Sequence, residues 1–102
     1  MSIENVLNEI AQERAAQDAT WGVSDFEDGV SHHWAASAQI AKDRCDDADA
    51  LGTTTWAMVL EEESLEALCE TDPAKLREEL VQVAAVAVAW IEALDRRNAS
   101  TN

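Results

Sequence analysis

Residues 60–68 read LEEESLEAL, a run that places four glutamates among three leucines. Leucine, glutamate and alanine are strong helix formers, so this run predicts a helix. Glutamate is ordinary on the solvent side of a helix. Fold and function therefore both depend on whether any of these glutamates shares a side with the apolar residues that must be buried.

The helix around this run is expected to span about residues 55–70, with side chains advancing about 100° per residue. When Glu63 sets the zero direction, Glu66 falls within roughly 60° of it. Glu61 points to the opposite, solvated side, and Glu62 lies at the margin. The side of Glu63 and Glu66 also carries the apolar residues Trp56, Val59, Leu60 and Ala67. Two carboxylates thus interrupt the stripe that should face the core.

The next helix repeats this pattern. Asp72 as N-cap and Pro73 at the first helical position predict its start, and it is expected to run to about Arg97. When Glu79 sets the zero direction, Gln82 lies within roughly 60° of it. The same side carries Leu76, Val83, Val86, Trp90 and Leu94.

These two helices are expected to pack antiparallel because the connection between them is short. Their apolar stripes would then bring Glu63 and Glu66 close to Glu79 and Gln82. A buried carboxylate without a partner is costly or becomes protonated. Oxygen ligands in this number suit Mg²⁺, with Mn²⁺ as a second option. The alternative is that each glutamate sits at a stripe edge and extends to water.

The whole chain reads as all-α. It has 102 residues, of which 47% are hydrophobic, with three glycines and one proline. Two further helices are expected over about residues 3–18 and 34–50, separated by an irregular segment suited to binding. We expect one four-helix, bundle-like domain over residues 1–97, completed by oligomerisation into a dimer or tetramer, and a flexible C-terminal tail over residues 98–102.

The formal net charge of −14 argues against binding to nucleic-acid backbones or anionic membranes, because phosphates would be repelled. Cys45 and Cys69 match no metal or redox spacing. With no signal peptide and no run long enough to span a bilayer, a cytoplasmic location is expected.

Five residues are candidates for substrate contact. Trp21 and Trp34 flank the irregular segment, where one ring could stack on a base, although packing is the commoner use of tryptophan. Lys42 and Arg44 are candidates for phosphate contact in a chain with only seven cations. Ordinary ion pairs with neighbouring acids are the alternative. Arg14 in the first helix could join a site between subunits.

Two short motifs carry a resemblance to a known family. EESLE at 62–66 has the form E-E-x-x-E, and ELVQ at 79–82 nearly has the form E-x-x-D. Together they resemble the MazG-like branch of the all-α nucleoside triphosphate pyrophosphohydrolases, and ERAAQDATWG at 13–22 is similar to short MazG-like proteins of actinobacterial and phage type. In that superfamily the two motifs lie on consecutive helices and coordinate Mg²⁺. Water then attacks a nucleoside triphosphate to release the monophosphate and pyrophosphate.

The resemblance assigns roles to individual residues. It implies that Glu63, Glu66 and Glu79 are metal ligands, and that Glu62 and Glu63 serve catalysis, with a spare glutamate as general base. Gln82 stands where the family has aspartate, and its amide oxygen brings no charge to a metal. Three readings follow: a Mg²⁺-dependent nucleotide pyrophosphohydrolase, a nucleotide-binding or sequestering module without hydrolysis, and a plain helical interaction protein.

Overall fold

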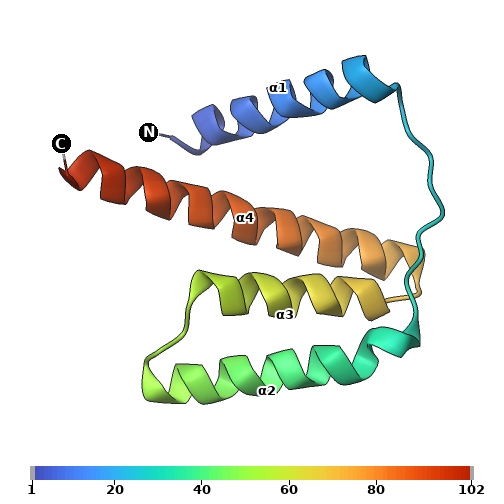
Figure 1. The fold of residues 1–102 in the computed structure, drawn as a ribbon, viewed down its shortest axis with the longest axis vertical. Helices are drawn as coiled ribbons and strands as arrows, with labels where there is room; N and C mark the ends of the chain where they lie inside the picture. Colours follow the sequence, from blue (N-terminus) through green and yellow to red (C-terminus); the bar gives the residue numbers. More distant parts are fainter. Residues whose placement is uncertain (1, 102) are drawn as a thin grey trace. The chain divides into compact units, whose positions relative to one another are not determined.

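A computed structural model describes the backbone of residues 2–101 and the side chains of residues 2–99. These residues form four α-helices and one 3-10 turn, without a strand, so the all-α prediction is confirmed (Figure 1). The elements are α1 (Ile3–Trp21), η1 (His32–Trp34), α2 (Ala35–Leu51), α3 (Trp56–Cys69) and α4 (Pro73–Thr101).

Side-chain caps fix the starts of three helices. Ser2, Thr55 and Asp72 each accept a hydrogen bond from the backbone N–H three residues further on, at 3.3, 3.2 and 3.0 Å. Each cap satisfies an N–H group that has no partner inside its helix. The predicted start at Asp72 is therefore confirmed, and Ser2 and Thr55 cap α1 and α3.

Helix α4 continues beyond the predicted end near Arg97. Its backbone is helical as far as Thr101, within the segment expected to be a tail. Residues 98–101 contain neither glycine nor proline, so nothing in the sequence stops the helix there. Asn102 lies outside the described residues.

Contacts along the chain define two compact units. The first combines residues up to Asp28 with those from Val88 onward, and the second spans Gly29–Ala87. Helix α4 therefore contributes its first half to the second unit and its second half to the first. The expectation of a single domain over residues 1–97 stays a prediction.

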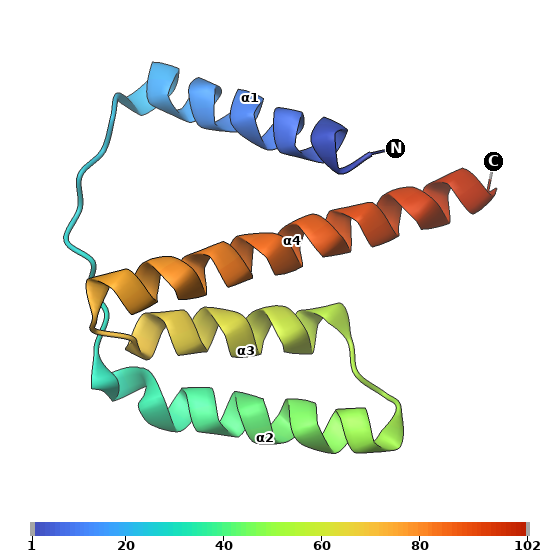
Figure 2. The same cartoon turned by 180° about the vertical axis from the view of Figure 1, so that it is seen from behind.

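In the second unit, α2 and α3 run antiparallel side by side, and the first half of α4 runs antiparallel to α3 on its other side (Figures 1 and 2). The buried side chains of α2 and α3 are all small, which lets the two helices approach closely. These residues are Ala38, Ala41, Cys45, Ala48 and Ala67. The Ser31 N–H donates to the Leu68 carbonyl at 3.0 Å and ties the start of η1 to the end of α3.

The first unit contains α1 and the second half of α4. Val6 on α1 is 3% exposed, whereas the neighbouring stripe of Ile3, Leu7 and Ile10 is 38–48% exposed. A helix normally buries such a stripe, so this unit leaves apolar surface open. None of the described helices has the length and apolar character needed to cross a bilayer.

Candidate metal centre

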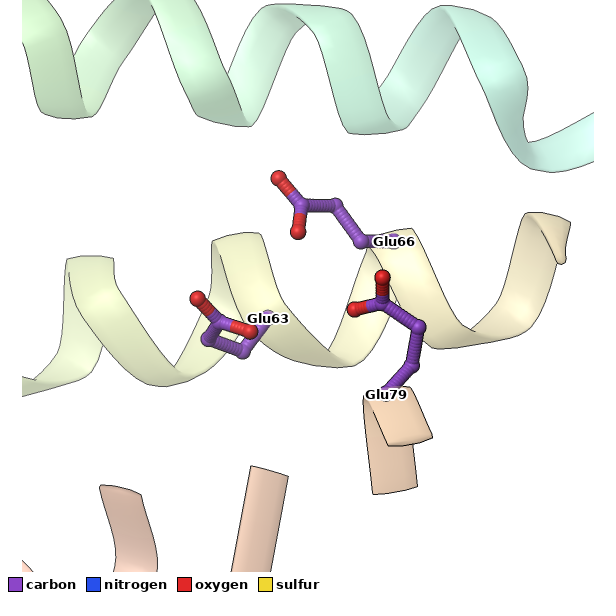
Figure 3. A group of neighbouring side chains, drawn as sticks. All are labelled: Glu63, Glu66 and Glu79. Atoms are coloured by element: carbon purple, nitrogen blue, oxygen red, sulfur yellow. The ribbon is translucent and has the colours of Figure 1, made fainter. Parts of the chain in front are cut away.

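Three glutamates from two helices converge in the second unit. Glu63 and Glu66 come from α3 and Glu79 comes from the first half of α4 (Figure 3). Each offers one carboxylate oxygen, and these three oxygens all lie within 4.8 Å of one another. Figure 3 shows the side chain of Glu79 rising from α4 toward α3, while that of Glu66 extends from α3 toward α2. We call Glu63, Glu66 and Glu79 the carboxylate cluster.

The local structure explains how the cluster forms. Thr55 and Asp72 fix where α3 and α4 begin, and the antiparallel hairpin then brings Glu79 opposite α3. Glu63 and Glu66 are three residues apart, so they occupy neighbouring positions on one helix surface.

Two oxygens of the cluster have no partner. Oε2 of Glu63 and Oε2 of Glu79 are closed off from solvent and accept no hydrogen bond. The three residues as a whole are only partly buried, so the cluster is accessible to solvent. Enclosed carboxylate oxygens without donors are unfavourable, and a proton or a cation is what would relieve them.

The pKa values of Glu63 and Glu66 are shifted in the direction that burial and proximity predict. Burial, followed by the negative charges of Glu79 and Glu62, raises the pKa of Glu63. Burial also raises the pKa of Glu66, and the charges of Glu63, Glu62 and Glu79 add to it. Lys42 opposes the shift of Glu66. In the metal-free protein, Glu63 and Glu66 therefore hold protons more tightly than exposed glutamates do.

This shift predicts how metal-free stability depends on pH. A carboxyl whose folded pKa is raised stabilises the fold below its unfolded pKa, and that contribution is lost as pH rises through the folded pKa. The Glu63→Gln variant lacks this titration. Its free energy of unfolding, relative to wild type, should therefore increase as pH rises from acid to neutral.

Urea unfolding of both proteins, with chelator present and across this pH range, measures the difference. Using the difference removes the contribution of carboxylates elsewhere in the chain. A wild-type-minus-variant difference that does not change with pH would contradict the raised pKa of Glu63.

The donor set fits a hard divalent cation. Mg²⁺ binds carboxylate oxygens at about 2.1 Å, so ligands on opposite sides of one ion are about 4.2 Å apart. A separation of up to 4.8 Å between oxygens closes by small rotations of three flexible side chains. No thiol or imidazole belongs to the cluster, which favours Mg²⁺ or Mn²⁺ over softer metals.

Glu62 and Gln82 flank the cluster differently. Glu62 is half-buried and lies near the Cys45 thiol of α2. Burial, followed by the neighbouring Glu62, raises the pKa of Cys45 to about 11, so the thiol stays protonated. Gln82 lies one turn after Glu79 and is exposed to solvent. Its assignment as a fourth ligand stays a prediction.

The predicted cationic contacts are all engaged in ion pairs on exposed surface. Arg14 pairs with Asp18 at 3.0 Å, Lys42 with Asp46 at 2.9 Å, and Arg44 with Glu61 at 2.5 Å. For Lys42 and Arg44, such pairs are the alternative to phosphate contact that the sequence left open. Arg44 lines a shallow pocket of about 300 Å³ between α2 and α3, together with Glu61 and Leu65.

The two candidate tryptophans have different surroundings. Trp21 ends α1 and is 74% exposed, so it is not packed into a core within the described chain. Its packing at an interface between copies stays a prediction. It lines a shallow pocket of about 260 Å³ in the first unit with Arg14 and Phe26. Trp34 is half-buried in η1, and its ring meets that of His33 edge-on with centroids 6.0 Å apart.

The structure adds one residue that the sequence argument did not connect to the cluster. Lys42 acts electrostatically on Glu62 and Glu66. Its position three residues before the buried Cys45 was the available signal, since this spacing places the two on adjacent parts of one helix surface.

No family model, curated protein or solved structure matches this chain. The residues of the site and their geometry therefore carry the functional argument.

Proposed function

We propose that this protein is a Mg²⁺-dependent nucleotide pyrophosphohydrolase of the MazG-like type, which hydrolyses a nucleoside triphosphate to the monophosphate and pyrophosphate. The observation that carries the proposal is the carboxylate cluster, with its two enclosed and unpartnered oxygens. The E-E-x-x-E motif and the near E-x-x-D motif contribute these same residues. In a plain helical interaction protein these glutamates would be solvated, and their carboxylate oxygens would not be enclosed without a hydrogen-bond donor.

Each residue has a proposed role. Glu63, Glu66 and Glu79 hold the ion, which when bound neutralises phosphate charge and favours departure of pyrophosphate. Glu62 lies beside the cluster without belonging to it, so its carboxylate is free to accept the proton of the attacking water.

Assembly into a dimer or tetramer belongs to the same proposal. No described side chain of the single chain is completely enclosed, and Ile3, Leu7 and Ile10 leave an apolar stripe on α1 open. A chain of this length buries a modest core by itself, so a second copy is an economical cover for the stripe. The four-helix, bundle-like arrangement would then be completed between copies.

A nucleotide-binding module without hydrolysis is the second candidate. The observation that favours it is Gln82, which is neutral and solvent-exposed where the motif has an acid. Three carboxylates and an amide hold a metal less tightly than four carboxylates do. Binding of nucleotide without turnover would establish this second candidate.

Incubation with a panel of ribonucleoside and deoxyribonucleoside triphosphates, in Mg²⁺ or Mn²⁺, tests hydrolysis directly. We expect monophosphate and pyrophosphate in equal amounts from at least one nucleotide, and no product with chelator. Chromatography resolves both products from the diphosphate and phosphate that contaminating phosphatases release. Absence of both products from every nucleotide at high protein concentration would refute the hydrolase.

A further inference from the structure

Two contacts define how α2 lies against the helix that carries most of the cluster. Arg44 Nη1 is 2.5 Å from Glu61 Oε1, and the Cys45 thiol donates to the Met58 carbonyl at 3.2 Å. Cys45 is 3% exposed, so this part of the interface is tightly packed. These two contacts fix the register of α2 against α3.

Lys42 lies on this same stretch of α2, one turn before Cys45. Its charge acts on Glu62 and Glu66, and Figure 3 shows the side chain of Glu66 extending toward α2. The Nζ atom pairs with Asp46 at 2.9 Å, and both side chains are about half exposed. The hydrogen bond and charge of Asp46 raise the pKa of Lys42, so it remains a cation.

The pair with Asp46 is readily exchanged. Ion pairs one helical turn apart on an exposed surface contribute little to stability. Lysine has a long flexible stem and three donors, so its ammonium group can leave one oxygen for another. Arg44 is less free to do so, because its partner Glu61 belongs to a different helix.

The negative charge of the proposed substrate would be stabilised by a cation such as Lys42. A nucleoside triphosphate is strongly anionic, and one divalent ion neutralises only part of its charge. The protein itself carries a net charge of −14, so its overall field repels the substrate. A lysine next to the cluster supplies local positive charge where a phosphate would lie.

We propose that Lys42 leaves Asp46 when nucleotide binds and donates to a phosphate oxygen of the substrate beside the carboxylate cluster. This inference rests on the proposed function and adds a substrate-binding residue to it. Because the contact is to phosphate, it selects ligands that carry a polyphosphate chain and does not discriminate between bases. Asp46 holds Lys42 in the nucleotide-free protein and competes with the substrate for it.

The Lys42→Gln variant tests the contact. Calorimetry with Mg²⁺ and a nucleoside triphosphate analogue that has an imido bridge between the α and β phosphorus atoms measures binding without turnover. The dissociation constant should rise by about 10- to 100-fold, as expected for a lost hydrogen bond between charged groups. Magnesium pyrophosphate should lose affinity by a similar factor, and Lys42→Arg should recover part of the loss.

Arg77→Gln is the control because it removes one positive charge from an exposed residue on the side of α4 that faces away from Glu79. Its dissociation constant should change by less than about threefold, through long-range electrostatics alone. If the wild type binds but Lys42→Gln changes the dissociation constant no more than this control does, the inference is overturned and the proposed function is not. A wild-type protein that binds neither the analogue nor pyrophosphate would overturn the proposed function, and this inference with it.

Asp46→Asn provides an effect of opposite sign. Freeing Lys42 should tighten binding of the analogue, and by more than Asp47→Asn, which removes the same charge from the neighbouring position. The extra gain in affinity from Asp46→Asn should vanish in a protein that also carries Lys42→Gln. Equal gains from both asparagine variants, or a gain that persists without Lys42, would show that Asp46 does not compete for this lysine.

Discussion

Replacing Glu63 with glutamine should abolish most Mg²⁺-dependent hydrolysis while leaving the fold intact. Glutamine matches glutamate in size but removes the charge from a residue of the carboxylate cluster. We expect a decrease of about 100-fold or more, since residues that only support metal ligands already contribute roughly 10- to 100-fold. Steady-state measurement of pyrophosphate release, with Mg²⁺ varied, separates weaker metal binding from a slower reaction.

Two neighbouring glutamates of α4 provide the control. Glu79 belongs to the cluster, whereas Glu78 is exposed and lies outside it. Glu79→Gln should therefore resemble Glu63→Gln, and Glu78→Gln should keep activity close to wild type. Comparable losses from Glu78→Gln and Glu79→Gln would mean that net charge rather than the cluster governs activity.

Mg²⁺ should raise the melting temperature of the wild-type protein by on the order of 10 °C when it is supplied well above its dissociation constant. An ion that binds only the folded state contributes about 2.7 kcal/mol at one hundred times that constant. For a domain of this size, each kcal/mol corresponds to several degrees. Burial and the charges of neighbouring glutamates raise the pKa values of Glu63 and Glu66, and the ion would offset the repulsion between these charges.

The gain in melting temperature with Mg²⁺ should also depend on pH in a definite direction. Protons and Mg²⁺ compete for the raised-pKa carboxyls, so the gain in melting temperature should shrink as pH falls toward 5. It should also be largely lost in Glu63→Gln. Sodium chloride at matched ionic strength is the control for screening of the overall charge. A gain of the same size with sodium, or in Glu63→Gln, would contradict a metal site at the cluster.

Local signals predict most of the secondary structure. The serine, threonine and aspartate caps determine helix starts because each satisfies a backbone N–H that the helix leaves open. The prediction for 98–101 is wrong about helix length, since only closeness to the terminus suggested a tail. Such closeness weakens a helix without stopping it.

The helical wheel also predicts which glutamates of LEEESLEAL converge. Glu63 and Glu66 meet Glu79, while Glu61 is exposed and paired with Arg44. These positions follow from helical periodicity and one short connection, which are local properties. The roles of the cluster residues in binding metal stay predictions.

Other features depend on contacts between distant segments and are beyond local patterns. The position of Lys42 near Glu66 depends on how α2 packs against α3, and small alanines and a cysteine set that packing. The exposure of Trp21 depends on whether another segment of the first unit packs over its ring. A tryptophan in an irregular region has the same sequence signature whether it is packed or exposed.

Crystals grown with Mn²⁺ and measured at the manganese absorption edge test the central claim most directly. The proposal predicts an anomalous peak within bonding distance of carboxylate oxygens from Glu63, Glu66 and Glu79, and its loss in Glu63→Gln crystals grown in the same way. A wild-type structure with no peak at these three residues at saturating Mn²⁺, or with their carboxylates turned to solvent, would contradict it.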